Sequence, residues 1–498
     1  MLEPAWARGA ADRLSGSRDG VTTRRAMGFG SLDLEQDPSL LSATELLDLY
    51  RAGALSPVEV TRACLYRIAR LNPRLNAFRM VDEEGALAAA HASEERWRRH
   101  EPFGLLDGIP ATVKDILLTK GWATLRGSRA IDPNQKWEED APSVARLREA
   151  GAILLGKTTT PEFGWKGVTD SPLTGITRNP WNPAMTPGGS SGGAAVAAAC
   201  GMGALHLGTD GGGSIRIPAG FTGIFGFKQS FGRVPAYPPS PFGTLAHVGP
   251  MTRTVTDAAL MLTVISRYDA RDWYALPDNE RGYLDELEKG VLRRRIAFSP
   301  SLGGHFVDPE VADLVAQAAH VFREAGAVVE EIDPPMDHGK GHIFTLHWFA
   351  GAANALAAYG PEKRAMMDPG LVEVAKEGAE IKLLEYLEAV RERENLGVRM
   401  NLFHRNWDLL LTPTLPYPAF EAGVETPFPG EGARWTDWTP FTYPFNLTRQ
   451  PAATVPCGFT SAGLPVGLQI IGPSYGDQLV LAAARAFEKR QPFKMPRS

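Results

Sequence analysis

Short apolar runs alternate with helical patterns along most of the chain, as expected for strands and helices that pack in layers. Two helix starts are clearly marked near the front. Ser42 and Ser56 each stand three residues before a glutamate, Glu45 and Glu59, which is the capping-box pattern. Pro57 then occupies the first helical position of the second segment. Both serines therefore predict the N-terminus of a helix.

Composition and periodicity predict further elements downstream. Helices are expected at residues 83–98, 143–150, 192–200 and 477–490. Strands are expected at residues 111–113, 153–155, 204–207, 224–227, 327–332, 409–411, 453–455 and 466–471. The stretch of about 269–386 is richer in helix formers and charge, and predicts a peripheral helical insertion or cap layer. The alternation as a whole favours an α/β fold in one compact domain.

The most informative segment contains two serines, Ser190 and Ser214, which each follow a run of glycines. Glycine is selected where the backbone needs unusual angles or approaches a reacting group closely. A run such as Gly211-Gly212-Gly213 can aim successive N–H groups at one point, as an oxyanion hole requires. The residues between the serines include Ala, Val and Leu, which belong in a core rather than in a flexible linker. This pattern predicts a catalytic serine centre.

Composition limits the function classes. With 44% hydrophobic and 22% charged residues, the 498-residue chain is typical of globular proteins. The net charge of −5 lacks the excess of positive charge that is typical of nucleic-acid-binding proteins. No apolar run is long enough to span a membrane. Three scattered cysteines, Cys64, Cys200 and Cys457, indicate a reducing compartment, so we expect a cytoplasmic protein. Residues 1–37 are expected to form a flexible extension without a secretory signal, and residues 491–498 a tail.

Two short motifs suggest other enzymes. The sequence G-A-I-L-L-G-K-T at 151–158 matches a phosphate-loop pattern, but its A-I-L-L core favours a strand over an anion-binding loop. The sequence G-S-S-G-G at 189–193 matches the nucleophile elbow, which would make Ser191 the nucleophile of a Ser-His-Asp hydrolase. That assignment needs a downstream histidine, and the settings of the candidates are more typical of surface or packing positions. The candidates are His247, His305, His320, His338, His342, His347 and His404.

Together with G-I-P-A-T-V-K-D at 108–115, the serine segment resembles the amidase signature family. The resemblance runs from about residue 38 to 490. It includes G-K-T at 156–158, R-N-P-W-N at 178–182, G-F-K at 226–228, G-P-M at 249–251 and G-L-Q-I at 467–470. It implies an amidase signature fold, with a mixed central β-sheet covered by helices on both faces (α/β/α), in a single domain at 38–490.

By motif position, the resemblance implies a triad in which Ser214 is the nucleophile, Ser190 the bridging serine after a cis peptide bond, and Lys114 the general base. Lysine acts as a base only when neutral, so its ordinary pKa of about 10.4 must fall by about three units, which burial can supply. The apolar neighbours of Lys114 favour such burial, although an exposed lysine at a strand end is the simpler alternative. If the segment is extended, Asp115 faces away from Lys114.

Other residues are expected to assist. The oxyanion hole is expected from the backbone N–H groups of Gly211, Gly212, Gly213 and Ser214. Ser191 is expected to support the site and to cap the helix that opens at Gly192. Hydrogen-bonding or ion-pair scaffolding is expected from Asp210 and Arg216, and similar support from Thr209 and Thr186.

The substrate is expected to be a small apolar or aryl amide, with ester or carbamate cleavage through the same acyl-enzyme. This rests on aromatic residues expected in loops near the site, of which about half are expected only to pack the core. The pocket candidates are Phe163, Trp165, Trp438, Phe441 and Tyr443. No metal, nucleotide, flavin or other cofactor is implied, nor a nucleic-acid or membrane partner, and the resemblance is compatible with a homodimer.

Two alternatives stay open. One is the glutamine-hydrolysing A subunit of a tRNA-dependent amidotransferase, which shares the triad. Gly211 and Ile217 differ from the threonine and glutamine usual in that subfamily, and residues 377–399 lack its R-R-I-x-L-G-T-Y pattern, so a stand-alone amidase is favoured. The other is an inactive binding member of the family, against which the retention of both serines and the lysine argues.

Overall fold

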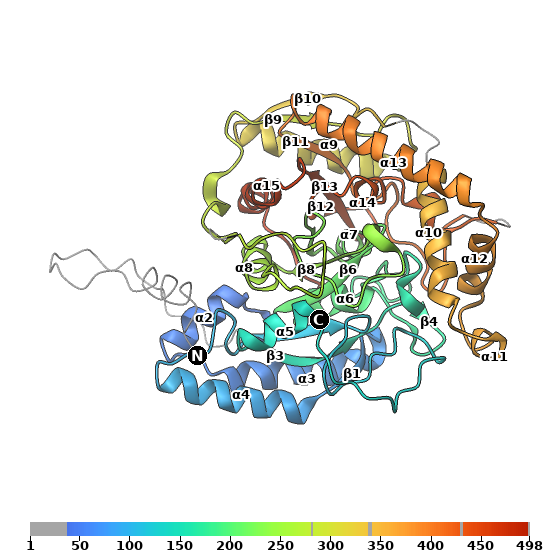
Figure 1. Ribbon diagram of the computed structural model, residues 1–498. Coiled ribbons are helices and arrows are strands. Elements are labelled where there is room, and N and C mark those ends of the chain that lie inside the picture. The colour runs from blue at the N-terminus through green and yellow to red at the C-terminus, as the bar shows by residue number, and fades with distance from the viewer. Residues whose placement is uncertain (1–36, 280–281, 337–340, 429–431, 497–498) are drawn as a thin grey trace. The chain divides into compact units, whose positions relative to one another are not determined.

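An 11-stranded mixed sheet forms the centre of the fold, in the order β1-β3-β2-β6-β8-β7-β12-β13-β11-β9-β10 (Figure 1). The computed structural model describes residues 37–279, 282–336, 341–428 and 432–496. The strands of this sheet are β1 (Phe78–Val81), β2 (Pro110–Lys114), β3 (Ile153–Thr158), β6 (Leu205–Asp210), β7 (Phe225–Lys228), β8 (His247–Thr252), β9 (Arg295–Phe298), β10 (Val328–Glu331), β11 (Leu409–Pro413), β12 (Ala452–Phe459) and β13 (Pro465–Ile471). Each strand expected from the sequence is confirmed within a few residues.

Helices begin where the caps predict. Ser42 and Ser56 each accept a backbone N–H at the start of a helix and complete a capping box. The longer helices are α2 (Ala43–Arg51), α3 (Pro57–Leu75), α4 (Glu83–Arg98), α5 (Pro142–Glu149), α6 (Gly192–Ala199), α7 (Arg216–Thr222), α8 (Val255–Ile265), α9 (Pro309–Glu324), α10 (Gly341–Leu356), α12 (Pro369–Ala379), α13 (Leu383–Phe403) and α15 (Asp477–Arg490).

The sheet is covered on both faces, as the pattern of β7 illustrates. Phe225 and Phe227 pack in the large core that also contains buried residues of α8, α9 and α15. Gly226 points to the opposite face, where a Cβ would lie 2.6 Å from Cβ of Ala219 in α7. A larger side chain at Gly226 would therefore push α7 away from the sheet. This confirms the expected mixed sheet with helices on both faces.

The same alternation directs Lys114 to its site. Ala111 and Val113 of β2 pack in the large core, whereas Thr112 faces the other way and bonds to His206 on β6. Lys114 ends β2, on the face of Thr112. Its side chain therefore leaves the large core toward the end of β6 and the start of α6.

The stretch of about 269–386, expected to be a peripheral helical insertion or cap layer, also contributes to the sheet. Its two strands, β9 and β10, pair in parallel at one edge. β9 has only four residues and begins at the last of three consecutive arginines, so its apolar run was too short to predict. Helices α10, α12 and α13 lie together beside the sheet (Figure 1) and share a second, aromatic-rich core.

The described residues from Pro38 onward form one compact unit. The extension expected at residues 1–37 lies outside the described residues, Asp37 excepted, as do the last two residues of the expected tail. In the part of the chain that the structure describes, no helix is long and apolar enough to cross a bilayer.

Candidate active site

Lys114 lies at the centre of a group of hydroxyls. Its Nζ is 2.7 Å from Ser190 Oγ, 2.9 Å from Ser191 Oγ and 2.8 Å from Thr209 Oγ1. The first two lie just before the start of α6 and the third near the end of β6, so two segments converge on the amine at the end of β2. The lysine is fully buried, which rules out the exposed strand-end alternative.

Burial also sets the electrostatics of Lys114. Removal from water lowers the pKa of its amine well below the usual value, and the negative charge of Asp210 opposes this only in part. The neighbouring Asp115 contributes no partner to the amine, as expected for the adjacent residue of an extended segment. Its carboxylate instead forms an ion pair with Arg79 Nε at 2.7 Å and lies 3.7 Å from Lys157 Nζ.

Ser190 follows a tightly packed glycine. The peptide bond between Gly189 and Ser190 is cis, as the resemblance implied. A Cβ on Gly189 would lie 2.5 Å from the backbone carbonyl of Val168, so no other residue fits at this position without a backbone shift. The Ser190 side chain is buried and directed to Lys114.

Ser191 does not cap α6, which corrects the sequence expectation. Its hydroxyl is only 3.0 Å from the backbone carbonyl of Thr209 and accepts the Thr209 N–H at 3.2 Å, besides contacting Lys114. These bonds turn the side chain away from the helix start, where no side-chain cap bond forms. Thr169 Oγ1 accepts the N–H of Gly192 instead, at 3.1 Å.

Ser214 lies in the turn between β6 and α7, beside the other two serines. Its carbonyl accepts the N–H of Ser191 at 3.1 Å, which ties the turn to the start of α6. The residue is 5% exposed, and its hydroxyl forms no hydrogen bond to another described residue. The 24-residue spacing from Ser190 to Ser214 accommodates one helix and one strand, as predicted.

The glycine run before Ser214 is held by two fixed contacts. Gly213 has φ +132° and donates its N–H to Asp210 Oδ1 at 2.8 Å. The carbonyl of Gly212 accepts a hydrogen bond from Thr442 Oγ1 at 2.7 Å. The prediction that Gly213 belongs to the oxyanion hole is therefore wrong, because its N–H is already used. The N–H groups of Gly211, Gly212 and Ser214 have no hydrogen-bond acceptor among the described residues.

Asp210 and Arg216 form the buried ion pair that anchors this turn. Arg216 Nη2 and Nε donate to the two carboxylate oxygens of Asp210 at 2.9 and 3.0 Å. Although burial favours the neutral acid, Arg216 holds the pKa of Asp210 well below its usual range. The pair therefore stays ionised, and the arginine offsets the negative charge that would otherwise keep Lys114 protonated.

Two residues from late in the chain complete this network, and sequence reasoning missed both of them. Arg216 Nη1 donates to Gln469 Oε1 at 2.7 Å and Arg216 Nη2 to Asn446 Oδ1 at 2.6 Å. Asn446 Nδ2 also donates to Asp210 Oδ1 at 2.9 Å. Gln469 lies in the G-L-Q-I motif, which is the one signal that could have indicated it.

The aromatic rings nearest the glycine run include two, Phe344 and Trp348, that the sequence did not indicate. A Cβ on Gly211 would lie 2.9 Å from the ring of Trp348, and one on Gly212 would lie 2.7 Å from the rings of Phe344 and Trp435. Of the five pocket candidates, three are fully buried packing residues, and the other two are 8% exposed. The buried ones are Trp165, Trp438 and Phe441, and the others are Phe163 and Tyr443. Tyr443 does stack on Phe344, at 4.6 Å between ring centroids.

Neither alternative motif forms the site that it suggested. Lys157 lies inside β3 and donates to the carbonyl of Leu117 and to Thr119 Oγ1, so residues 151–158 form no phosphate loop. His247 Nδ1 lies 2.9 Å from the carbonyl of Leu245, and burial lowers its pKa well below the usual value. No described histidine bonds to a serine of the site, and His338 lies outside the described residues. Nor do the described residues contain a cluster of side chains that could hold a metal.

A mixed sheet that carries a buried lysine within hydrogen-bond distance of Ser190 and Ser191 fits the amide-hydrolysing class that the sequence resemblance implied, and the comparisons with known proteins agree. The sequence model of the amidase family matches residues 59–481, so the chain belongs to this family and is an amidase.

Relatives of several kinds share the fold. The chain is 36% identical to an acylamidase of Rhodococcus erythropolis over 92% of this chain and 97% of that protein. It is 37% identical to the A subunit of the glutamyl-tRNA(Gln) amidotransferase of Myxococcus xanthus, over 91% of this chain and 98% of that one. The crystal structure of a bacterial aryl acylamidase matches with a TM-score of 0.84 at 33% identity, over 91% of this chain and 96% of that chain.

Proposed function

We propose that this chain is a stand-alone serine amidase that cleaves the C–N bond of linear amides through an acyl-enzyme, with Ser214, Ser190 and Lys114 as its catalytic triad. The observation that carries the proposal is the buried amine of Lys114, 2.7 Å from Ser190 Oγ, with a pKa lowered well below its usual value. A neutral amine has one lone pair and can accept a proton from a hydroxyl.

The hydrogen bonds around Lys114 favour Ser190 as its proton donor. A neutral amine donates two N–H bonds and accepts one. The hydroxyl proton of Ser191 is committed to the carbonyl of Thr209, so Ser191 accepts from Lys114. The lone pair of the amine is then left for Ser190 or Thr209, and Ser190 is the closer of the two.

The proposed reaction runs through Lys114, Ser190 and Ser214 in turn. Lys114 takes the proton of Ser190, Ser190 takes that of Ser214, and Ser214 Oγ bonds to the amide carbon. The carbonyl electron pair moves onto oxygen, where the N–H groups of Gly211, Gly212 and Ser214 stabilise it; one such donor is worth about 10²–10³ in rate. As the tetrahedral intermediate collapses, the relay returns a proton to the departing nitrogen. Water then enters by the same relay and releases the acid from Ser214.

Two variants test the triad. In Ser214→Ala and Lys114→Met, kcat should fall by about 10³-fold or more, because each removes a member of a unit that acts jointly. Ser461→Ala, at an exposed turn, is the matched control and should retain normal turnover. Circular dichroism and thermal melts confirm that the variants are folded. Turnover close to that of the native enzyme in either triad variant would refute the assignment.

The substrate proposal is an apolar or aryl amide, with ester or carbamate cleavage by the same acyl-enzyme. It is supported by Phe344, Trp348 and Trp435, whose rings lie against the glycine run, and by the acylamidases among the relatives. A panel of p-nitroanilides, p-nitrophenyl esters and aryl carbamates, compared with small primary amides, tests it. Turnover of the primary amides alone would contradict an aromatic pocket.

A glutamine-hydrolysing component of an amidotransferase is the second candidate, and the Myxococcus xanthus relative favours it. Such a component would release ammonia from glutamine only weakly by itself and much faster in its complex. Ammonia release from glutamine, measured with and without the other subunits of an amidotransferase, separates the two. A large rise on adding them would favour this second candidate over the stand-alone amidase.

A further inference from the structure

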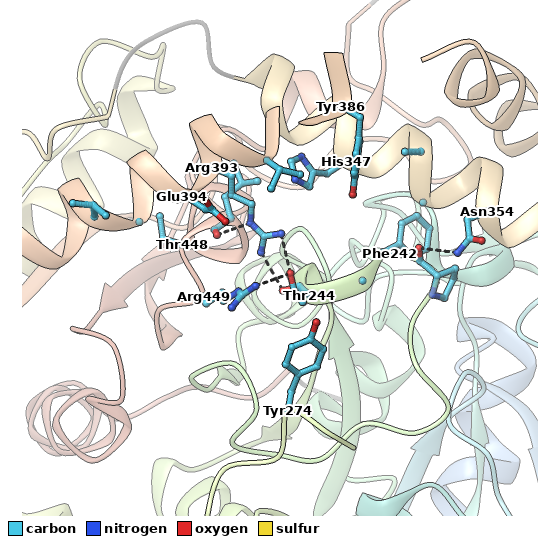
Figure 2. Close-up of a pocket in the computed structure, with 18 of the residues that line it drawn as sticks. Phe242, Thr244, Tyr274, His347, Asn354, Tyr386, Arg393, Glu394, Thr448 and Arg449 are labelled. Atoms are coloured by element: carbon cyan, nitrogen blue, oxygen red, sulfur yellow. Dashed lines mark hydrogen bonds between the residues drawn. The ribbon is translucent and has the colours of Figure 1, made fainter. Parts of the chain in front are cut away.

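A pocket of about 710 Å³ opens on the side of the α10–α13 helices, and the proposed reaction does not use it (Figure 2). Its walls come from segments far apart in sequence: α10, α13, the turn at residues 241–244, Tyr274 and residues 447–449. Neither Lys114 nor any of the three serines lines it.

Two arginines converge at the wall of this pocket, Arg393 half-buried and Arg449 exposed. Arg393 Nη1 and Arg449 Nη2 both donate to Thr244 Oγ1, at 2.9 and 3.1 Å (Figure 2). The remaining hydrogen bonds of Arg393 go to backbone carbonyls, among them that of Leu447 at 2.8 Å. Within the described residues neither guanidinium forms an ion pair with a carboxylate. Two like charges are therefore held together over neutral oxygens, and they leave several N–H groups for a ligand.

The local electrostatics reflect this lack of compensation. Burial and the neighbouring Arg449 lower the pKa of Arg393 to about 10, which leaves the side chain charged near neutral pH. Glu394 is the one carboxylate among the lining residues, and it is exposed. The lining residues thus carry two positive charges and one negative charge.

The rest of the wall indicates what kind of anion fits. Phe242, Tyr274 and Tyr386 supply ring surface, and α13 adds the aliphatic side chains of Val390 and Val398. Paired guanidiniums match the two oxygens of a carboxylate, and the rings match an apolar body. Because one acidic side chain stands at the same pocket, a monoanion fits the net charge better than a phosphate dianion.

His347 adds a polar atom that has no partner. The residue lines the pocket, is 7% exposed, and its Nδ1 lies 2.9 Å from the carbonyl of Ile343. Nε2 is buried without a hydrogen-bond partner. With Nδ1–H donated to the carbonyl, Nε2 is an acceptor that a ligand hydroxyl or N–H could satisfy.

The pocket is adjacent to the glycine run but separate from it. The Phe242 ring stacks on Trp348 at 4.0 Å between centroids, and Trp348 in turn contacts Gly211. On a second route, Arg393 donates to the carbonyl of Asn446, whose side chain binds Asp210. Both connections run from the pocket wall to the turn that carries Ser214.

We propose that this pocket is a binding site for a small carboxylate with an aromatic or apolar body, held by Arg393 and Arg449 and distinct from the catalytic serines. The walls and charges of the pocket alone support this site, so it does not depend on the proposed triad.

Crystals soaked in 4-bromobenzoate test the location directly. The expected result is an anomalous bromine peak among Phe242, Tyr274 and Tyr386, with the carboxylate in hydrogen-bond reach of both guanidiniums. Bromine found only beside the glycine run, or nowhere in the pocket, would overturn the proposal.

Calorimetry tests the chemistry, with benzoate, its neutral analogue benzamide, and inorganic phosphate as the probes. Benzoate should bind at least about tenfold more tightly than benzamide, and Arg449→Gln should weaken benzoate binding by about tenfold. Arg405→Gln, which makes the same charge change at an exposed position outside the pocket, should leave benzoate binding unchanged. Equal affinity for benzamide, a preference for phosphate, or no effect of Arg449→Gln would each refute a carboxylate site. None of these readouts uses activity, so a failure here is distinct from a failure of the triad.

Discussion

Replacing Thr209 by valine should shift the pH dependence of catalysis, because Thr209 is the partner of Lys114 that belongs neither to the triad nor to the start of α6. Its Oγ1 lies 2.8 Å from Lys114 Nζ. An acceptor at this distance stabilises the charged ammonium more than the neutral amine. Removing the hydroxyl should therefore lower the pKa of Lys114 further.

The size of this shift follows from hydrogen-bond energies. A bond to a charged group contributes about 1.5–3 kcal/mol, and one between neutral groups about 0.5–1.5 kcal/mol. The difference of about 1 kcal/mol corresponds to somewhat less than one pKa unit, at about 1.36 kcal/mol per unit. Since the neutral amine is the active form, activity rises with pH through the pKa of Lys114. The acid limb of kcat/KM should therefore move to lower pH by about half to one unit.

The assay is kcat/KM against pH, with an activated anilide or ester substrate, for the native enzyme, Thr209→Val and Thr209→Ser. The serine variant keeps the hydroxyl and should retain the native profile. An unmoved acid limb in Thr209→Val would show that Lys114 does not control it. A shift to higher pH would show that Thr209 donates to the neutral amine, which would contradict the assignment of Ser190 as the donor.

Two further variants test the scaffold around Ser214. Arg216→Met should lower the free energy of unfolding by about 3–5 kcal/mol in urea denaturation, because it leaves the buried Asp210 carboxylate without its counter-ion. The matched control is Arg51→Met, since the exposed pair of Arg51 and Asp48 should contribute at most about 1 kcal/mol. An equal loss of stability in the two variants would refute this reasoning. Gly213→Ala should reduce kcat by about 10²-fold or more, because φ is +132° and the new Cβ would collide with Thr442 Oγ1. Gly53→Ala, at φ +66° with no atom within 4 Å, is the matched control, and should keep native kcat.

The sequence predicted the centre of the site because its chemistry depends on local residue types. Glycine before Ser190 and before Ser214 is required by backbone geometry, and the apolar residues around Lys114 indicate burial. The placement of these three residues in adjoining segments follows from the strand and helix between them. Their roles rest on the family motif and stay a proposal.

What the sequence could not predict depends on contacts over long distances in the chain. Asn446 and Gln469 meet Arg216 across more than 200 residues, and no local pattern records such a pairing. Gly213 was misassigned because the direction of its N–H depends on the Asp210 side chain. β8 was not expected as a strand because it contains Pro250, which the sheet tolerates although proline cannot donate to a ladder.

The proposed relay requires a neutral Lys114 beside Ser190, and neutron diffraction from a deuterium-exchanged crystal at about pD 8 measures this directly. The expected result is two deuterons on Lys114 Nζ and a Ser190 hydroxyl deuteron directed to the amine. Three deuterons on Nζ, all donated to the surrounding hydroxyl oxygens, would contradict it.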